Sequence, residues 1–153
     1  MIKPQNHFKL PLLFISLCLF FLITGFRENV PANRVVGIWE SEEKNLQIEM
    51  FEDNGEFGGR MIYFKCSSDS IMHTSRDSEN PDSKYASRKL LGLKLVEDLS
   101  YQGDNVWGNG KIYDPNSGNT WEARIQLTGP NTAIVRGYWK FRWIGRSMVF
   151  NRL

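Results

Sequence analysis

Cysteine and histidine are scarce in this chain of 153 residues, which contains two of each. Cys18 lies in an N-terminal segment that we expect to be removed, so Cys66 is the only cysteine of the mature chain. No intramolecular disulfide can then form, and we expect a free, partly buried thiol or, alternatively, a disulfide between two chains. Zinc sites need three or four nitrogen or sulfur ligands, and His73 is the only mature histidine. The sequence therefore predicts no cofactor and no metal.

Enzyme motifs and excess charge are absent as well. The chain has no Gly-x-Ser-x-Gly and no P-loop, and Gly108-x-Gly110 lacks the third glycine of a dinucleotide-binding loop. The formal net charge of +2 is carried entirely by residues 1–32, which hold three basic residues and one acidic residue. A balanced mature domain without a basic stripe excludes nucleic acid as an expected partner and argues against binding to an acidic membrane.

One long apolar run is present, between Leu10 and Phe26, and two lysines precede it. A basic stretch before an apolar stretch is typical of a secretory signal peptide. We expect cleavage after Ala32 or, alternatively, after Gly25. A run of about 17 residues also lies at the short end of what spans a bilayer, so an uncleaved anchor is the other interpretation. The sequence thus predicts a signal peptide at 1–32 and an exported protein of the bacterial periplasm or envelope, which meets the membrane only through this segment if it stays uncut.

The remaining chain, 33–153, is patterned for short strands. Residues 46–52 and 120–128 alternate apolar and polar side chains, which is the period of a half-buried strand. No helix of ordinary length is indicated. Eight strands are predicted, at 35–40, 46–52, 57–65, 91–95, 106–113, 120–128, 132–139 and 147–152, with a polar turn at 97–105. We predict a single all-β domain, an eight-stranded antiparallel up-and-down β-barrel that is filled by side chains or holds one small ligand, with two stacked sheets as the alternative.

A long loop at 66–89 interrupts this pattern and is rich in Ser, Asp and Asn. Loops of such length are usually functional or disordered. Asn80-Pro81-Asp82 predicts a rigid Asx turn, and residues 81–87 predict a short helical turn capped by Asn80. Four oxygen-bearing side chains at alternating positions could hold a hard cation, but the EF-hand pattern is missing, and solvated loop carboxylates are the favoured interpretation.

Three arginines near turns, Arg88, Arg136 and Arg146, define a candidate polar site. In a structural interpretation they pair with carboxylates of the loop and turns and tie the loop to the barrel mouth. In a functional interpretation one or more of them face the mouth and take an anionic ligand. The candidate ligand-binding residues are Asp77, Asn80, Asp82, Arg88, Tyr113, Asp114, Arg136, Tyr138 and Arg146.

Five motifs occur in a characteristic order along the chain. They are Gly37-Ile-Trp39, Asp77-x-x-Asn80-Pro81-Asp82, Gly110-Lys-Ile-Tyr113-Asp114-Pro115-x-x-Gly118, Arg136-Gly137-Tyr138 and Gly145-Arg146. The set resembles the DUF2147 family of small exported bacterial proteins of uncharacterised function, over nearly the whole mature chain. The resemblance implies a calycin-type, lipocalin-like barrel with Trp39 plugging one end, and it implies no activity.

Three functions remain for such a domain, and the sequence favours binding over catalysis. The first is a non-enzymatic barrel with a small, partly apolar ligand in its Trp-rich interior, where the 66–89 loop acts as a lid and an arginine orients a polar head. A filled interior would contradict it. The second is an envelope interaction protein that uses a strand edge or an apolar patch. The third is an enzyme with Asp77 or Asp82 as a general base of raised pKa.

Overall fold

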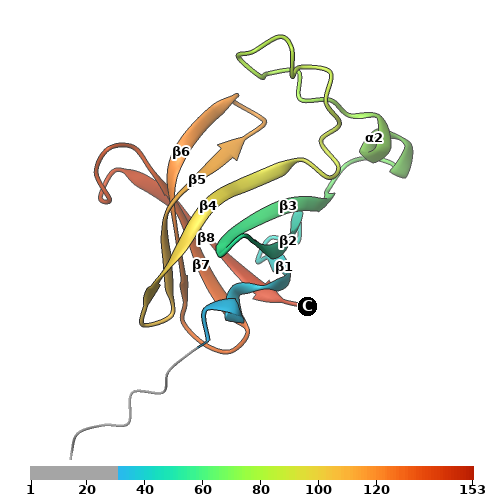
Figure 1. The fold of residues 1–153 in the computed structure, drawn as a ribbon. Helices are drawn as coiled ribbons and strands as arrows, with labels where there is room; N and C mark the ends of the chain where they lie inside the picture. The colour runs from blue at the N-terminus through green and yellow to red at the C-terminus, as the bar shows by residue number, and fades with distance from the viewer. Residues whose placement is uncertain (1–30) are drawn as a thin grey trace, which may run out of the picture.

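Eight antiparallel strands close into a barrel in the computed structural model, which describes residues 31–153 (Figure 1). Residues 1–30, and with them most of the predicted signal peptide, lie outside the described residues. Each strand pairs with the next along the chain, and β8 pairs with β1. The predicted up-and-down barrel is confirmed, and the sheet is not divided into two stacks. The strands are β1 (Gly37–Ser41), β2 (Leu46–Asp53), β3 (Glu56–Phe64), β4 (Lys94–Gly103), β5 (Val106–Asp114), β6 (Asn119–Leu127), β7 (Thr132–Tyr138) and β8 (Gly145–Arg152).

The fourth strand differs from its prediction. β4 runs for ten residues, through most of the predicted polar turn at 97–105, and only Asp104 and Asn105, both with positive φ, turn the chain. The polar residues of β4 lie mainly on its outer side, where Glu97 is exposed and pairs with Lys111 of β5. Leu99 is fully buried. A locally polar stretch is therefore a strand, because pairing on both sides outweighs its weak strand propensity.

Two short helices accompany the barrel in the described residues: the 3-10 helix η2 (Ala32–Val35) and the α-helix α2 (Asp69–Thr74). The sequence did not predict α2, which begins after the N-cap Ser68, whose hydroxyl accepts a hydrogen bond from the amide of Ile71. The helical turn predicted at 81–87 is confirmed in part: the amides of Tyr85 and Ala86 donate to the carbonyls of Asp82 and Ser83, but these residues form successive turns and no helix. Within residues 31–153, no helix combines the length and apolar character needed to cross a bilayer.

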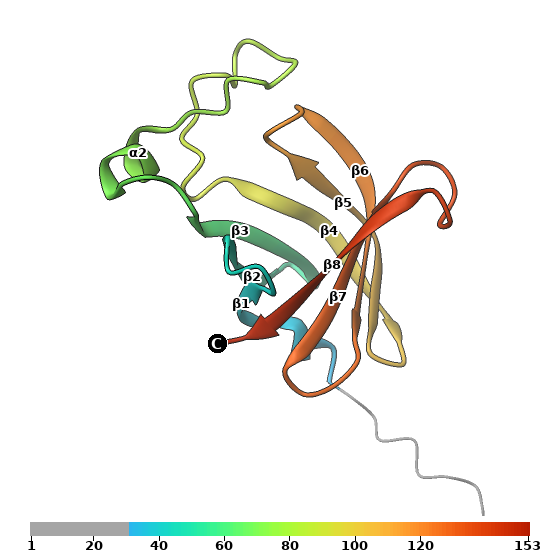
Figure 2. The same cartoon turned by 180° about the vertical axis from the view of Figure 1, so that it is seen from behind.

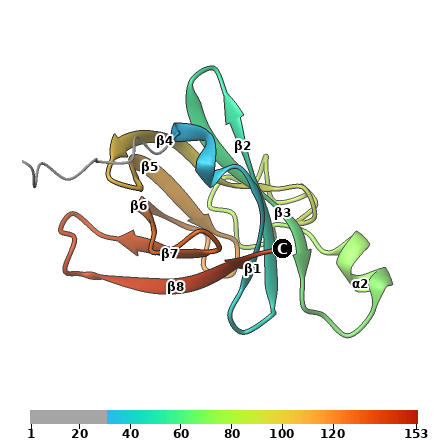
Figure 3. The same cartoon turned by 90° about the horizontal axis from the view of Figure 1, so that it is seen from below.

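The two ends of the barrel are built differently. Since the strands alternate in direction, η2, the C-terminus and the tight turns after β2, β4 and β6 share one end. Figure 3 views the molecule from this end. The other end carries the long segment between β3 and β4 and the connection between β7 and β8. Figures 1 and 2 show α2 and the β7–β8 connection projecting on opposite sides of the molecule.

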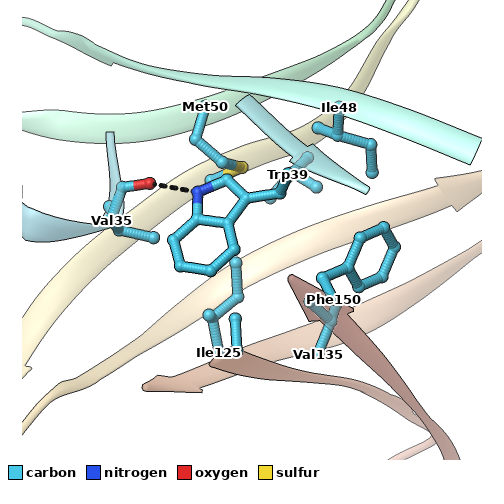
Figure 4. A pocket seen from close by; sticks show the side chains of 9 residues that line it. Val35, Trp39, Ile48, Met50, Ile125, Val135 and Phe150 are labelled. Atoms are coloured by element: carbon cyan, nitrogen blue, oxygen red, sulfur yellow. Dashed lines mark hydrogen bonds between the residues drawn. The ribbon is translucent and has the colours of Figure 1, made fainter. Parts of the chain in front are cut away.

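Trp39 lies inside the barrel next to η2, where its indole N–H donates to the carbonyl of Val35 at 2.8 Å (Figure 4). The guanidinium of Arg152 covers its ring, 4.2 Å from the centroid, and donates to the backbone carbonyls of Val36 and Arg34. Burial lowers the pKa of Arg152, and the positive charge of Arg34 adds to this effect. These contacts join the first and last strands to η2 at one end of the barrel. The role of Trp39 as a plug stays a prediction.

A second indole, that of the fully buried Trp107, holds η2 from the opposite wall. Its N–H donates to the carbonyl oxygen of Ala32 at 2.9 Å. Cleavage after Ala32 would remove this acceptor, whereas cleavage after Gly25 would keep it.

We expect a barrel domain that begins at Phe26 to be more stable than one that begins at Asn33. Without Ala32, the buried indole N–H of Trp107 loses its acceptor, which costs about 1–3 kcal/mol. Urea unfolding of both chains measures the difference. The substitution Trp107→Phe in both backgrounds is the control, because it removes the donor and should shrink the difference between them. Equal stability of the two starting chains would contradict a structural role for Ala32.

Candidate functional site

The barrel interior is filled. Its cavity has a volume of about 20 Å³ and is lined by apolar side chains alone, those of Val35, Trp39, Ile48, Met50, Val96, Ile125, Ala133, Val135 and Phe150 (Figure 4). A space of roughly 10–15 Å³ is needed for one water molecule, so this cavity is far too small for an organic ligand. The interior ligand predicted from the sequence is therefore not supported, and a lid has no chamber to cover.

The long segment between β3 and β4 is instead fastened to the barrel through Asp77. This carboxylate is fully buried and accepts three side-chain hydrogen bonds. One oxygen accepts from the Tyr113 hydroxyl at 2.6 Å, and the other accepts from Arg88 at 2.8 Å and from Asn80 at 2.7 Å. Four of the predicted site residues thus form one cluster, which we call the Asp77 cluster. For Arg88, this ion pair agrees with the structural interpretation of the sequence, in which the arginine pairs with a carboxylate of the loop.

Hydrogen bonding decides the charge of the Asp77 cluster. Burial by itself would raise the pKa of Asp77, but the hydrogen bonds from Tyr113, Arg88 and Asn80 and the charge of Arg88 outweigh it and hold the pKa below its usual range. Burial, together with the neighbouring carboxylate, raises the pKa of Tyr113 to about 12. The pair is therefore an ionised carboxylate beside a neutral phenol that donates to it.

Backbone hydrogen bonds join the two sides of the loop around the Asp77 cluster. The amide of Asp77 donates to the carbonyl of Arg88 at 2.9 Å, and an isolated β-bridge joins Arg76 to Lys89. The predicted Asx turn is confirmed, since the Asn80 side chain accepts from the amide of Asp82 at 3.0 Å. The segment thus has an internally bonded loop whose base is Asp77 and Arg88.

This loop packs against the turn between β5 and β6. Gly118 in that turn has a φ of +67°, and a Cβ atom there would collide with the carbonyl oxygen of Glu79. Glycine satisfies both constraints, since it tolerates positive φ and lets another backbone approach closely. Figures 1 and 2 show the loop beyond the tips of β5 and β6.

The strand residues next to this loop face outward. Val96 lines the interior cavity and pairs with Ile112, so both of these side chains face inward. Because successive side chains on a strand point to opposite faces, Lys111 and Tyr113 point away from the interior. Tyr113 therefore binds Asp77 from the outer face of the barrel.

A polar cleft of about 310 Å³ lies between the loop and this outer face. It is lined by residues of the loop and of the ends of three neighbouring strands: Asn80, Pro81, Asp82, Tyr85 and Arg88 from the loop, Lys94, Leu95 and Glu97 from β4, Lys111 and Tyr113 from β5, and Gly118 and Thr120 around the start of β6. The guanidinium of Arg88 also lies over the Tyr85 ring, 4.6 Å from its centroid. This cleft is the candidate site.

The predicted site residues divide among three places. Asn80, Asp82, Arg88 and Tyr113 line the cleft, and Asp77 supports them from beneath. Asp114 is the last residue of β5, and its carboxylate accepts from the amide of Asn116 and the hydroxyl of Ser117 in the turn that follows.

Arg136, Tyr138 and Arg146 lie elsewhere, on the β7–β8 hairpin. Arg136 is on the outer face, where it donates to the carbonyl of Arg142 and the hydroxyl of Ser147. Tyr138 lies on the same face as Arg136, and Arg146 pairs with Gly137 at the exposed start of β8. The predicted pairing of Arg136 and Arg146 with loop carboxylates is therefore wrong.

The cleft also contains residues that the sequence did not single out, chiefly Tyr85, Lys94, Glu97, Lys111 and Thr120. Alternation within β5 would have placed Lys111 on the same face as Tyr113. The sequence predicts a strand at 91–95 and a turn at 97–105, so it does not give the register that brings Glu97 of β4 to the cleft.

Other predicted uses of the loop find no support in the described part of the chain. No three His, Cys, Asp or Glu side chains of residues 31–153 gather as metal ligands. Asp77 does not match the predicted general base, because its pKa is lowered and not raised. The Asp82 carboxylate accepts a hydrogen bond from the amide of Lys84.

The closure of the barrel bears on the predicted interaction protein. The described strands leave no free strand edge to which a partner could bind. Cys66 is a partly buried free thiol within residues 31–153, and a disulfide between two chains stays a prediction.

The fold defines the class of this protein as a lipocalin-like β-barrel. A similar solved structure is protein HP1028 from the human pathogen Helicobacter pylori, described as belonging to the lipocalin family, with a TM-score of 0.70 and 24% sequence identity over 78% of this chain and 82% of that one. At this identity the likeness concerns the fold alone. Residues 37–152 match the family DUF2147, described as uncharacterized protein conserved in bacteria, and the chain belongs to this family. A comparison with curated proteins finds no match.

We expect Tyr113→Phe to destabilise the domain by about 1–3 kcal/mol, because it leaves a buried carboxylate oxygen without its donor. Chemical unfolding monitored by circular dichroism measures the loss. Tyr63→Phe is the matched control, since the Tyr63 hydroxyl has no hydrogen bond within residues 31–153 and its removal should change stability by less than about 0.5 kcal/mol. Similar losses in both variants would contradict the importance of the Tyr113 hydroxyl.

The Asp77 cluster should also give stability a specific dependence on pH. Because the folded state lowers the pKa of Asp77, the unfolded chain binds more protons in the acid range, and stability rises with pH there. The contribution is complete above about pH 4 and is lost as the pH falls through the folded pKa. The raised pKa of Tyr113 makes stability fall as the pH rises in the alkaline range. The contribution of Tyr113 to stability is complete below its ordinary pKa of about 10 and is lost as the pH rises through about 12.

Comparing unfolding free energies of the wild type and Asp77→Asn across the acid range tests this dependence. The difference between them should shrink as the pH falls. For the control Asp53→Asn, at an exposed carboxylate, the unfolding free energy should follow the same pH dependence as that of the wild type. A constant offset for Asp77→Asn at all pH values would show that its charge is not what stabilises the loop.

Proposed function

We propose that this protein is an exported, non-enzymatic barrel that binds a small, partly apolar anion in the cleft between residues 80–88 and the outer face of β4 and β5. The observation that carries the proposal is the contrast between the polar cleft, of about 310 Å³, and the filled interior, of about 20 Å³. Small-molecule sites begin at roughly 300 Å³. Export to the periplasm or envelope rests on the basic and apolar pattern of the N-terminal segment.

The lining of the cleft suits an acidic group attached to an apolar body. Lys94 and Lys111 line the cleft from neighbouring strands and, with Arg88, bring three positive charges to it against the two carboxylates of Asp82 and Glu97. Arg88 donates to Asp77 through one nitrogen, and its side chain is 42% exposed, so the rest of its guanidinium fork can donate to a ligand. The ring of Tyr85, which is 39% exposed, offers an apolar wall.

Two features favour binding over catalysis. The best-organised carboxylate, Asp77, has a lowered pKa and accepts hydrogen bonds from three donors, so it is not poised to take a proton. The Asp77 cluster instead fixes Arg88 and Asn80 at the cleft before any ligand arrives. A preorganised site loses less conformational entropy on binding, which raises affinity.

The test is a titration of the isotopically labelled barrel domain with phenyl phosphate and benzoate, followed by amide chemical shifts. We expect shifts at Tyr85, Lys94, Lys111 and Thr120, and weaker ones with the uncharged control benzyl alcohol. Loss of two cationic contacts in Lys94→Gln/Lys111→Gln should weaken binding roughly tenfold or more. The control Lys44→Gln/Lys65→Gln removes the same charge outside the cleft.

Three results would contradict the proposal. These are the absence of shifts with either anion, shifts confined to interior residues such as Ile48 and Ile125, and equal weakening by the two double variants. The second result would return the site to the barrel interior.

A further inference from the structure

The connection between β7 and β8, residues 139–144, exposes four large apolar side chains. Those of Trp139, Phe141, Trp143 and Ile144 are each more than half exposed, and Trp143 reaches 75%. We call this connection the β7–β8 tip. It projects from the barrel on the side opposite α2 (Figures 1 and 2). Soluble domains rarely gather exposed aromatic rings in this way unless the rings contact something.

The rings of the β7–β8 tip are held in place rather than left loose. Phe141 and Trp143 stack with their centroids 4.7 Å apart and their planes 11° from parallel. Trp139 packs edge-on against Trp121 at 5.9 Å, and its amide donates to the carbonyl of Ile144 at 3.0 Å. Arg136 donates to the carbonyl of Arg142 and secures the tip to β7. An ordered backbone therefore presents these apolar rings to the solvent.

Cations alternate with the rings. Lys140 and Arg142 lie between the aromatic residues, and Arg146 follows at the start of β8. The chain has no Asp or Glu after Glu122, so acidic partners are missing from β7, β8 and the tip itself. Within residues 31–153, none of the three cations has a carboxylate within ion-pair distance.

The positive charge continues onto the neighbouring outer face. Arg124 of β6 and Arg136 of β7 are directly paired across the strands. Like charges in this position repel and destabilise a sheet. An anionic partner on this side of the barrel would relieve the repulsion.

We propose that the β7–β8 tip docks on the surface of an anionic lipid bilayer, with its rings in the headgroup region and its cations against lipid phosphates. Aromatic rings favour the membrane interface, and cationic side chains beside them reach the headgroups. A protein partner would need about 800 Å² from each side for a stable contact, whereas these exposed side chains occupy one six-residue connection. The balanced charge of the whole domain argues against membrane binding only on average, because it conceals this local excess of cations.

The experiment mixes the full-length chain with vesicles of phosphatidylcholine, with or without phosphatidylglycerol, whose acyl chains carry nitroxide groups that quench tryptophan. The first tryptophan of the chain is Trp39, so an inserted N-terminal segment brings no indole into the bilayer. We expect quenching that requires phosphatidylglycerol and weakens as salt is added.

Lys140→Gln/Arg142→Gln should raise the lipid concentration for half-maximal quenching by about tenfold or more. Each cation contributes about 1 kcal/mol at an anionic surface, and a loss of about 1.4 kcal/mol weakens binding tenfold. Phe141→Ser, which keeps every cation and every tryptophan, should reduce the depth of quenching. The control Lys44→Gln/Lys84→Gln removes the same charge from exposed positions outside the tip and should behave as the wild type.

Three results would overturn the proposal. The first is the absence of quenching in anionic vesicles. The second is an equal loss in the tip variant and in the control, which would indicate a non-specific effect of net charge. The third is self-association without lipid that Phe141→Ser abolishes in sedimentation, which would make a second copy of the chain the occupant of the tip.

Discussion

The carboxylate of Asp77 has no contact with solvent, and the arrangement of the long segment between β3 and β4 depends on it. A buried negative charge is tolerated only where donors surround it, and here they come from β5 and from both sides of the loop: Tyr113, Asn80 and Arg88. The same three side chains also line the cleft. The interaction that fixes the loop to the barrel therefore also shapes the candidate binding site.

The barrel provides a rigid support rather than a container. At one end, next to η2, Arg152 lies over the ring of Trp39, and the interior is packed by aliphatic and aromatic side chains. A lipocalin-like fold is often associated with an interior ligand, but fold alone does not determine function. Within residues 31–153, the polar cleft lies on the outer face of the barrel and not in its interior.

The cleft and the β7–β8 tip use different parts of the same sheet. The cleft is built on β4 and β5, whereas the tip extends β7 and β8 and carries exposed rings and unpaired cations. Neither surface uses residues of the other. A protein held at a lipid surface through the tip would therefore keep its cleft available for a soluble ligand.

The sequence by itself predicted the barrel, the up-and-down strand order and the Asx turn, because alternation and turn residues are local patterns. It offered the pairing of Arg88 with a loop carboxylate as one of two interpretations. Only the tertiary structure decided the rest. The volume of the interior depends on how side chains from several strands, such as Trp39 of β1 and Ile125 of β6, fill it together, and the length of β4 depends on pairing with two neighbours. The strand register placed Lys94 and Lys111 beside Arg88 and turned Arg136 outward, and a register between distant segments leaves no local trace in the sequence.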